Sequence, residues 1–140
     1  MTIEWRDAMS IGDEVIDEDH QNLIRLINKY EMAIAQKNQR ELENAFNGLV
    51  DYAHEHFERE ERVMEAVYFP NRRKHAEHHR DLLHRIEDFH KSLSVDHKLD
   101  LKASSSFLHD WLINHVLNED MQIKPHLTGD RCPRKGQPAG

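Results

Sequence analysis

The sequence is poor in residues that interrupt regular structure, with 5 Gly and 4 Pro among 140 residues. A single cysteine, Cys132, excludes an internal disulfide framework. No apolar run approaches the roughly 18 residues of a membrane-spanning helix. The first ten residues also lack the basic-then-apolar layout of a secretion signal, so we expect a cytoplasmic protein without membrane insertion. Positive charge is in deficit as well. The net charge of −7 argues against non-specific electrostatic binding to nucleic acid.

The stretches between the few breakers predict helices, because they are rich in Leu, Glu, Lys, Arg and Gln. β-branched residues are sparse and do not alternate, which excludes a strand pattern. Apolar residues recur at spacings of three and four, as amphipathic helices require. We therefore predict an all-α, up-down-up-down four-helix bundle with an extended N-terminal arm. The expected segments are the arm over 1–12, helices over 17–37, 39–67, 72–92 and 101–120, one domain over 1–128, and a flexible tail over 129–140.

Histidine is what the chain has in excess, with 12 residues. Advancing about 100° per residue places at least one imidazole on the apolar face of every predicted helix. On the second helix His56 and Glu60 point inward about 40° apart, so both can reach one point, whereas His54 and Glu58 point outward. On the first helix His20 is inward but off centre, and Asp19 also lies within the apolar face.

Two ambiguities remain on the other helices. His75, His78 and His79 all fall inside the apolar face of the third helix, and both the i,i+4 pair and the i,i+3 pair starting at His75 can bind one metal ion. On the fourth helix His115 points inward and ideal geometry favours Glu119 as its partner. Asp120 falls at the edge of that face.

Buried carboxylates cost several kcal/mol unless they are paired or bound to a metal. A lone inward histidine is usually an ordinary core residue, but inward imidazoles on four helices together favour a metal centre inside the bundle. Five imidazoles and two carboxylates exceed the roughly four ligands that zinc accepts. Two octahedral ions with bridging carboxylates and a shared oxo or hydroxo bridge can use all seven and keep one position open. Nitrogen and oxygen ligands of this kind suit iron.

At this point the sequence resembles the hemerythrins, in particular the bacterial hemerythrin-like proteins. The resemblance covers about residues 1–127 and rests on several motifs in order: Ile3-Glu4-Trp5 with Ile11-Gly12, Asp17-Glu18-Asp19-His20, His56-Phe57-Glu58-Arg59-Glu60-Glu61, His75-Ala76-Glu77-His78-His79, and His115-Val116-Leu117-Asn118-Glu119-Asp120.

The resemblance implies one choice at each of these two ambiguities, His79 over His78 and Asp120 over Glu119, and it also implies Glu60 rather than Glu61. The implied cofactor is two non-haem iron ions. One iron is expected to carry three histidines and be six-coordinate, and the other to carry two histidines and hold the open position, with two carboxylates bridging. The six-coordinate iron is expected to be bound by His75, His79 and His115, and the other iron by His20 and His56. The implied bridging carboxylates are Glu60 and Asp120.

The resemblance further implies reversible dioxygen binding for storage, transport or sensing, without enzymatic turnover. Oxygen is expected to bind end-on as a hydroperoxide at the five-coordinate iron. We expect an apolar wall that excludes water and slows irreversible oxidation, formed by Leu23, Phe57, Trp111 and Leu112. The alternatives are a di-iron enzyme that reduces oxygen, peroxide or nitric oxide, and a metal-dependent regulatory module. We expect a monomer.

The other seven histidines need no metal. They are His54, His78, His84, His90, His97, His109 and His126. Most are expected to be solvated or to lie just outside the ligands, and His78 and His109 are the best candidates for contacting a metal ligand. Outside Glu60, the charged run over 58–62 is expected to be a solvated helix face.

Overall fold

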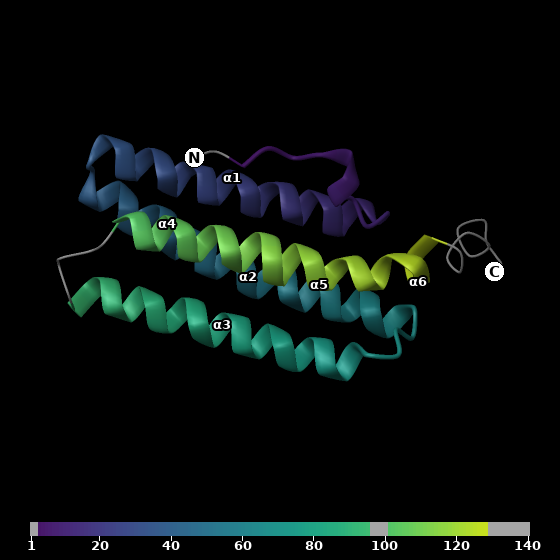
Figure 1. Cartoon of the computed structure of the whole chain (residues 1–140). Coiled ribbons are helices and arrows are strands. Elements are labelled where there is room, and N and C mark those ends of the chain that lie inside the picture. Colours follow the sequence, from purple (N-terminus) through teal and green to yellow (C-terminus); the bar gives the residue numbers. More distant parts are fainter. Residues whose placement is uncertain (1–2, 96–100, 129–140) are drawn as a thin grey trace.

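A computed structural model describes residues 3–95 and 101–128 of the chain, so Cys132 and the expected tail lie outside the described residues. Four long helical runs lie side by side with alternating direction (Figure 1). They are α1 (Glu14–Gln36), α2 (Gln39–Ala66), α3 (Arg72–Val95) and a run that begins with α4 (Leu101–Asp110). The described residues contain no strand. The predicted all-α four-helix bundle is confirmed.

The fourth run changes its helical type along its length. After α4 come a π-helical segment, η2 (Trp111–Leu117), the short α5 (Asn118–Asp120), a 3₁₀ turn, η3 (Met121–Ile123), and α6 (Lys124–Thr128). The helix was expected to end near residue 120, ahead of Pro125. Instead Pro125 stands in the first turn of α6, where its missing N–H interrupts no intrahelical bond.

Side-chain caps explain where the first two helices begin. The Asp13 carboxylate accepts hydrogen bonds from the backbone N–H of Val15 at 3.0 Å and of Ile16 at 3.1 Å. This cap starts α1 at Glu14, three residues before the predicted boundary. Asn38 caps α2 in the same way, through the backbone N–H of Glu41 at 3.2 Å.

The N-terminal arm runs back along α1, as Figure 1 shows. The Asn28 side chain accepts from the backbone N–H of Ile3 at 2.9 Å and donates to its carbonyl at 2.8 Å. This paired contact fixes the arm on the helix. The arm is not extended throughout, because Asp7–Met9 forms a 3₁₀ turn, η1.

The apolar core is divided into two clusters. The larger contains Leu23, Phe57, Leu82 and Val116, and the smaller contains Ile16, Met64, Phe69 and Ile123. Along α1, α2 and the fourth run, buried polar residues lie between a residue of the larger cluster on one side and a residue of the smaller cluster on the other. The fold therefore encloses a polar layer between two apolar ones.

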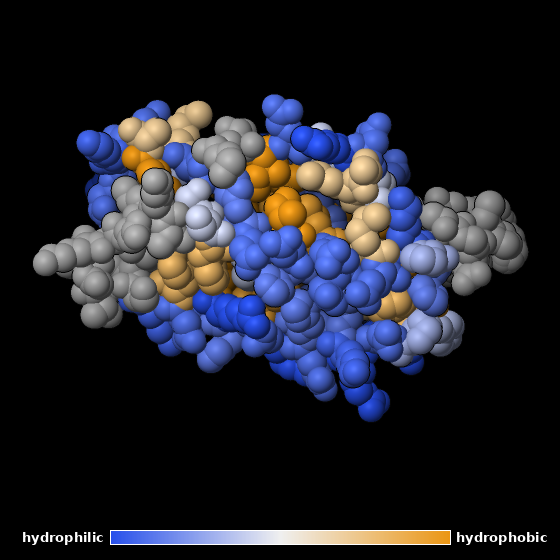
Figure 2. Space-filling model, in the orientation of Figure 1, coloured by the Kyte–Doolittle hydropathy of each residue, from blue (hydrophilic) through white to orange (hydrophobic). Residues whose placement is uncertain are grey.

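The visible face of the molecule is mostly hydrophilic, with a band of hydrophobic residues in its upper half (Figure 2). Among residues 3–95 and 101–128, none of the helices is both long and apolar enough to cross a membrane.

Candidate metal centre

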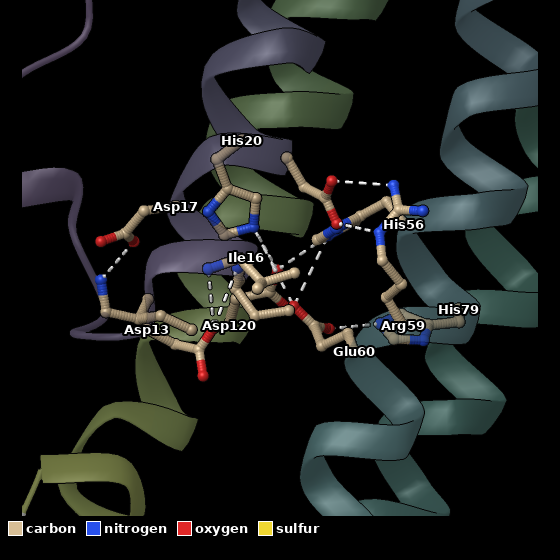
Figure 3. A network of polar contacts seen from close by, with 12 residues as sticks. Asp13, Ile16, Asp17, His20, His56, Arg59, Glu60, His79 and Asp120 are labelled. Carbon is tan, nitrogen blue, oxygen red and sulfur yellow. Dashed lines mark hydrogen bonds and ion pairs between the residues drawn. The ribbon is translucent and has the colours of Figure 1, made fainter.

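Six of the predicted ligand residues meet in the polar layer. They form two overlapping groups of possible metal ligands, in each of which the donor atoms lie within 4.8 Å of one another. Glu60 and Asp120 belong to both groups. The first group adds His20 and His56, and the second adds His75 and His79. All six residues are at least 96 % buried. Figure 3 shows His20, His56, Glu60 and Asp120 directed toward one another from α1, α2 and α5.

Each shared carboxylate presents one oxygen to each end of the centre. Glu60 Oε1 lies 3.0 Å from His75 Nε2 and 2.8 Å from His79 Nε2, while its Oε2 lies 3.5 Å from His56 Nε2. Asp120 repeats the pattern. Its Oδ1 lies 2.8 Å from His75 Nε2, and its Oδ2 lies 2.7 Å from His20 Nε2. This is the arrangement that two bridging carboxylates require.

The donor set fits a pair of cations. Glu60 Oε2 and His56 Nε2 are buried, lie 3.5 Å apart at one end of the centre, and have no hydrogen-bond partner among the described residues. A buried polar atom without a partner costs about 1–3 kcal/mol. Imidazole nitrogens and carboxylate oxygens in one closed layer are also the ligands that divalent iron and similar ions accept.

The carboxyl groups of Glu60 and Asp120 have pKa values shifted in opposite directions. Burial raises the pKa of Glu60 well above its usual value, and the neighbouring Asp120 raises it further. Burial also opposes ionisation of Asp120. Nevertheless, polar contacts with Glu60, His20, His56 and His75 bring the Asp120 pKa well below its usual value. Without a cation, the chain therefore favours one shared negative charge rather than two.

The imidazoles at the two ends also differ. Burial lowers the pKa of His79 to about 3, so this ring is neutral at physiological pH. Burial disfavours the charged form of His56 as well, but the neighbouring carboxylates of Asp120 and Asp19 raise its pKa above the usual value. A neutral ring is what a metal ligand requires, so protons should compete with metal more strongly at the His56 end than at the His79 end.

Asp19 is a supporting residue that the ligand assignment did not include. This carboxylate is 4 % exposed and accepts from His56 Nδ1 at 3.1 Å and from the Tyr52 hydroxyl at 2.6 Å. Arg59 donates to it through Nε and through one terminal nitrogen, both at 2.8 Å. Its inward position on α1 was visible in the sequence, but periodicity does not show what an inward carboxylate contacts.

The charged run over 58–62 is not wholly a solvated face. Arg59 is 29 % exposed and holds Asp19. Glu61 Oε2 lies 2.8 Å from His79 Nδ1, with 40 % of its side chain exposed. The expectation was wrong for these two residues, because long side chains at the edge of a helix face can reach back to buried partners.

His115 does not join the six. Its side chain is 30 % exposed, and its Nε2 lies 3.4 Å from Asp110 Oδ2. The expectation that it points inward is wrong in this structure, because the residue lies in the π-helical segment η2, where an angle of 100° per residue does not hold. Its role as a ligand stays a prediction.

The same change of helical type bears on the choice between Glu119 and Asp120. Asp120 is 1 % exposed and lies in the centre. Glu119 lines a surface cavity of about 220 Å³ with Lys74 and His78. Ideal helix geometry thus selected the wrong one of these two carboxylates to point inward.

His78 and His109, the best candidates for supporting the ligands, do not contact them through any described hydrogen bond. His109 Nε2 lies 3.2 Å from Glu31 Oε2. The His78 ring lies 5.8 Å from the His115 ring, and its buried Nε2 has no partner among the described residues. Instead, Asp19 contacts the Nδ1 atom of His56, and Glu61 contacts the Nδ1 atom of His79.

The four residues of the expected apolar wall are all at least 98 % buried, and all lie in the larger cluster: Leu23, Phe57, Trp111 and Leu112. Phe57 stacks on the His79 ring, with centroids 4.0 Å apart and planes within 10° of parallel. Trp111 is anchored by its indole N–H, which donates to the Leu82 carbonyl at 3.0 Å. An aromatic surface therefore covers the larger-cluster side of the centre.

Comparison with known proteins points the same way. A relative named bacteriohemerythrin from Stenotrophomonas maltophilia is 27 % identical over 128 residues, which cover 89 % of this chain and 83 % of the relative. A bacteriohemerythrin from Pseudomonas aeruginosa is 29 % identical over 118 residues, covering 83 % and 75 % respectively. A crystal structure of wild-type hemerythrin superposes with a TM-score of 0.81 at 24 % identity, covering 91 % of this chain and 98 % of that one, which establishes the shared fold.

The family model described as the hemerythrin HHE cation binding domain matches residues 11–127, a span that includes all six convergent residues. The chain belongs to the hemerythrin family.

Proposed function

We propose that the chain binds dioxygen reversibly at a non-haem di-iron centre and acts in oxygen storage, transport or sensing rather than in catalytic turnover. The observation that carries the proposal is the pair of carboxylates, Glu60 and Asp120, each with one oxygen toward either end of the centre. Membership of the hemerythrin family and the bacteriohemerythrin relatives support the same function.

The residues have distinct roles in this proposal. His75 and His79 hold one ion and His20 and His56 the other, with the two carboxylates shared. His115 is proposed as a third imidazole at the His75 end. The iron pair supplies reversible electron exchange with oxygen, which we propose binds end-on as a hydroperoxide at the ion with fewer histidines.

The polypeptide contributes a dry, closed environment. Phe57 covers the His79 ring, and Leu23 and Leu112 are fully buried in the same cluster. Such a wall restricts access of water and protons to the bound oxygen, which slows its loss as peroxide.

The test is an oxygen cycle followed by optical absorption. The protein is loaded with iron(II) under nitrogen, exposed to air, and then returned to nitrogen. We expect a coloured oxygenated form that appears in air and disappears when the oxygen is removed. Immediate irreversible conversion to the diferric protein contradicts reversible binding. Sustained oxygen consumption with a reductant, well above spontaneous oxidation, indicates an enzyme instead.

A further inference from the structure

The two ends of the centre are supported very differently. At one end His79 Nδ1 contacts Glu61, whose side chain is 40 % exposed. At the other end His56 Nδ1 contacts Asp19, which is 4 % exposed. Water can replace a half-exposed carboxylate, but it cannot reach a buried one without rearrangement of the fold. The His56 end therefore depends on one specific side chain.

Asp19 is itself held from both sides. Its Oδ1 accepts from the Tyr52 hydroxyl at 2.6 Å and from a terminal nitrogen of Arg59 at 2.8 Å. Its Oδ2 accepts from Arg59 Nε at 2.8 Å and from His56 Nδ1 at 3.1 Å. The Arg59 guanidinium also lies over the Tyr52 ring, 5.4 Å from its centroid. Both carboxylate oxygens are thus committed as acceptors, and neither can donate.

This arrangement dictates the tautomer of His56. A hydrogen bond to an acceptor-only carboxylate requires a proton on Nδ1, which in the neutral ring leaves Nε2 with its lone pair. Nε2 is the atom that faces Glu60 Oε2 and Asp120 Oδ2, each at 3.5 Å, and it has no hydrogen-bond partner among the described residues. In the neutral ring, the nitrogen that can bind an ion therefore points into the metal centre.

We propose that Asp19, clamped by Arg59 and Tyr52, is a positioning residue that holds His56 with Nε2 free and so sets the metal affinity of the His20/His56 end. The inference rests on the proposed metal centre. It goes beyond that centre because it assigns a task to three residues that are not expected to touch an ion.

The test variant is Asp19→Asn, which keeps the shape but replaces one acceptor oxygen with an NH₂ group. That group must face either His56 or the Tyr52 and Arg59 donors, and in the first case it forces the His56 proton onto Nε2. The matched control is Glu87→Gln. This exchange removes an equivalent carboxylate contact, 3.0 Å from His54 Nε2, where both side chains are about half exposed.

The first readout needs no metal. Nitrogen-15 NMR of the metal-free protein at alkaline pH reports which ring nitrogen of His56 carries the proton. We expect Nδ1–H alone in the parent chain and in Glu87→Gln, and a clear population of Nε2–H in Asp19→Asn. An unchanged tautomer in Asp19→Asn overturns the proposal, whatever the centre binds.

The second readout is competition for iron(II) against a chelator under nitrogen. Loss of an orienting group outside the ligand shell typically costs about 10–100-fold in metal affinity. We expect that loss for one of the two ions in Asp19→Asn and none in Glu87→Gln. Parent-like affinity for both ions overturns the proposal, whereas a parent chain that binds fewer than two ions contradicts the proposed function.

Two further variants apply if Asp19→Asn does not fold. Tyr52→Phe and Arg59→Gln each leave Asp19 in place but remove part of its clamp, and both positions are more exposed than Asp19. We expect a smaller weakening of the same ion in each. Unchanged affinity in both variants contradicts the role assigned to the clamp.

Discussion

The substitution Glu60→Gln should affect the free energy of unfolding in opposite directions in the metal-free and the iron-loaded protein. Glu60 is fully buried, its Oε1 contacts His75 and His79, and its Oε2 has no hydrogen-bond partner among the described residues. A glutamine can keep its oxygen at the Oε1 position and place its NH₂ at the Oε2 position, 3.5 Å from the His56 Nε2 acceptor. The variant also removes a carboxyl group whose ionisation is opposed by burial and by Asp120.

In the metal-free protein we therefore expect Glu60→Gln to be as stable as the parent or more stable, by up to about 2 kcal/mol. With iron(II) the order should invert. An ion present at a hundred times its dissociation constant adds about 2.7 kcal/mol to the free energy of unfolding, so two ions add roughly 5 kcal/mol to the parent. The variant keeps an oxygen toward His75 and His79 but loses the carboxylate oxygen that faces His56, together with the bridging charge, so it should gain only a small part of that.

The assay is urea unfolding under nitrogen, with and without iron(II). Glu58→Gln is the matched control, because it makes the same exchange at an exposed position of α2 and should change stability by less than about 0.5 kcal/mol in both conditions. The reasoning is refuted if metal-free Glu60→Gln is destabilised by more than about 2 kcal/mol while its stabilisation by iron equals that of the parent chain.

Three further predictions concern the wall, a helix cap and acid stability. Leu23→Ala should destabilise the protein by about 2–5 kcal/mol and speed irreversible oxidation of the oxygenated form, as followed by unfolding and by optical decay; unchanged decay contradicts the proposed wall. Asp13→Ala should cost about 1 kcal/mol through loss of the α1 cap without changing the number of ions bound per chain. Lowering the pH from about 6.5 to about 3 should destabilise the metal-free protein, because unfolded His79 takes up a proton that the folded ring rejects. His79→Gln should flatten that dependence, and an equally steep curve rules out this origin.

Most of the fold could be predicted from the sequence, because long segments with few Gly or Pro residues and with apolar residues at spacings of three and four fit a helix and not a strand. The start of α1 was placed late because the cap lies at Asp13, outside the periodic stretch. The predicted end of the last helix, near residue 120, is too early, because a proline such as Pro125 is also common just after the end of a helix. A proline in the first turn of a new helical segment gives the same sequence signal.

The centre was predictable where helices are regular. His20, His56, Glu60, His75 and His79 lie on α1, α2 and α3, and all five meet. The ideal angles placed each of them inward, although they left His78 open as an alternative to His79. The angles failed on the fourth run, where the π-helical segment alters the direction of each later residue. That is why Asp120, rather than Glu119, points inward and why His115 does not.

The contacts outside the ligand set could not be predicted. The sequence shows that Asp19 lies on an inward face and that Arg59 lies in a charged run. Pairing them depends on how α1 and α2 are placed side by side, which spacing within either helix does not record. The pair was found only from the distances between the two helices.

The central claim is that two carboxylates hold a coupled pair of ions among these buried imidazoles. Titration of the metal-free protein with iron(II) under nitrogen, followed by Mössbauer spectroscopy after oxidation, tests it most directly. The account predicts an end point of two ions per chain and a diamagnetic, coupled diferric ground state. An end point of one ion, or two magnetically independent ions, would contradict it.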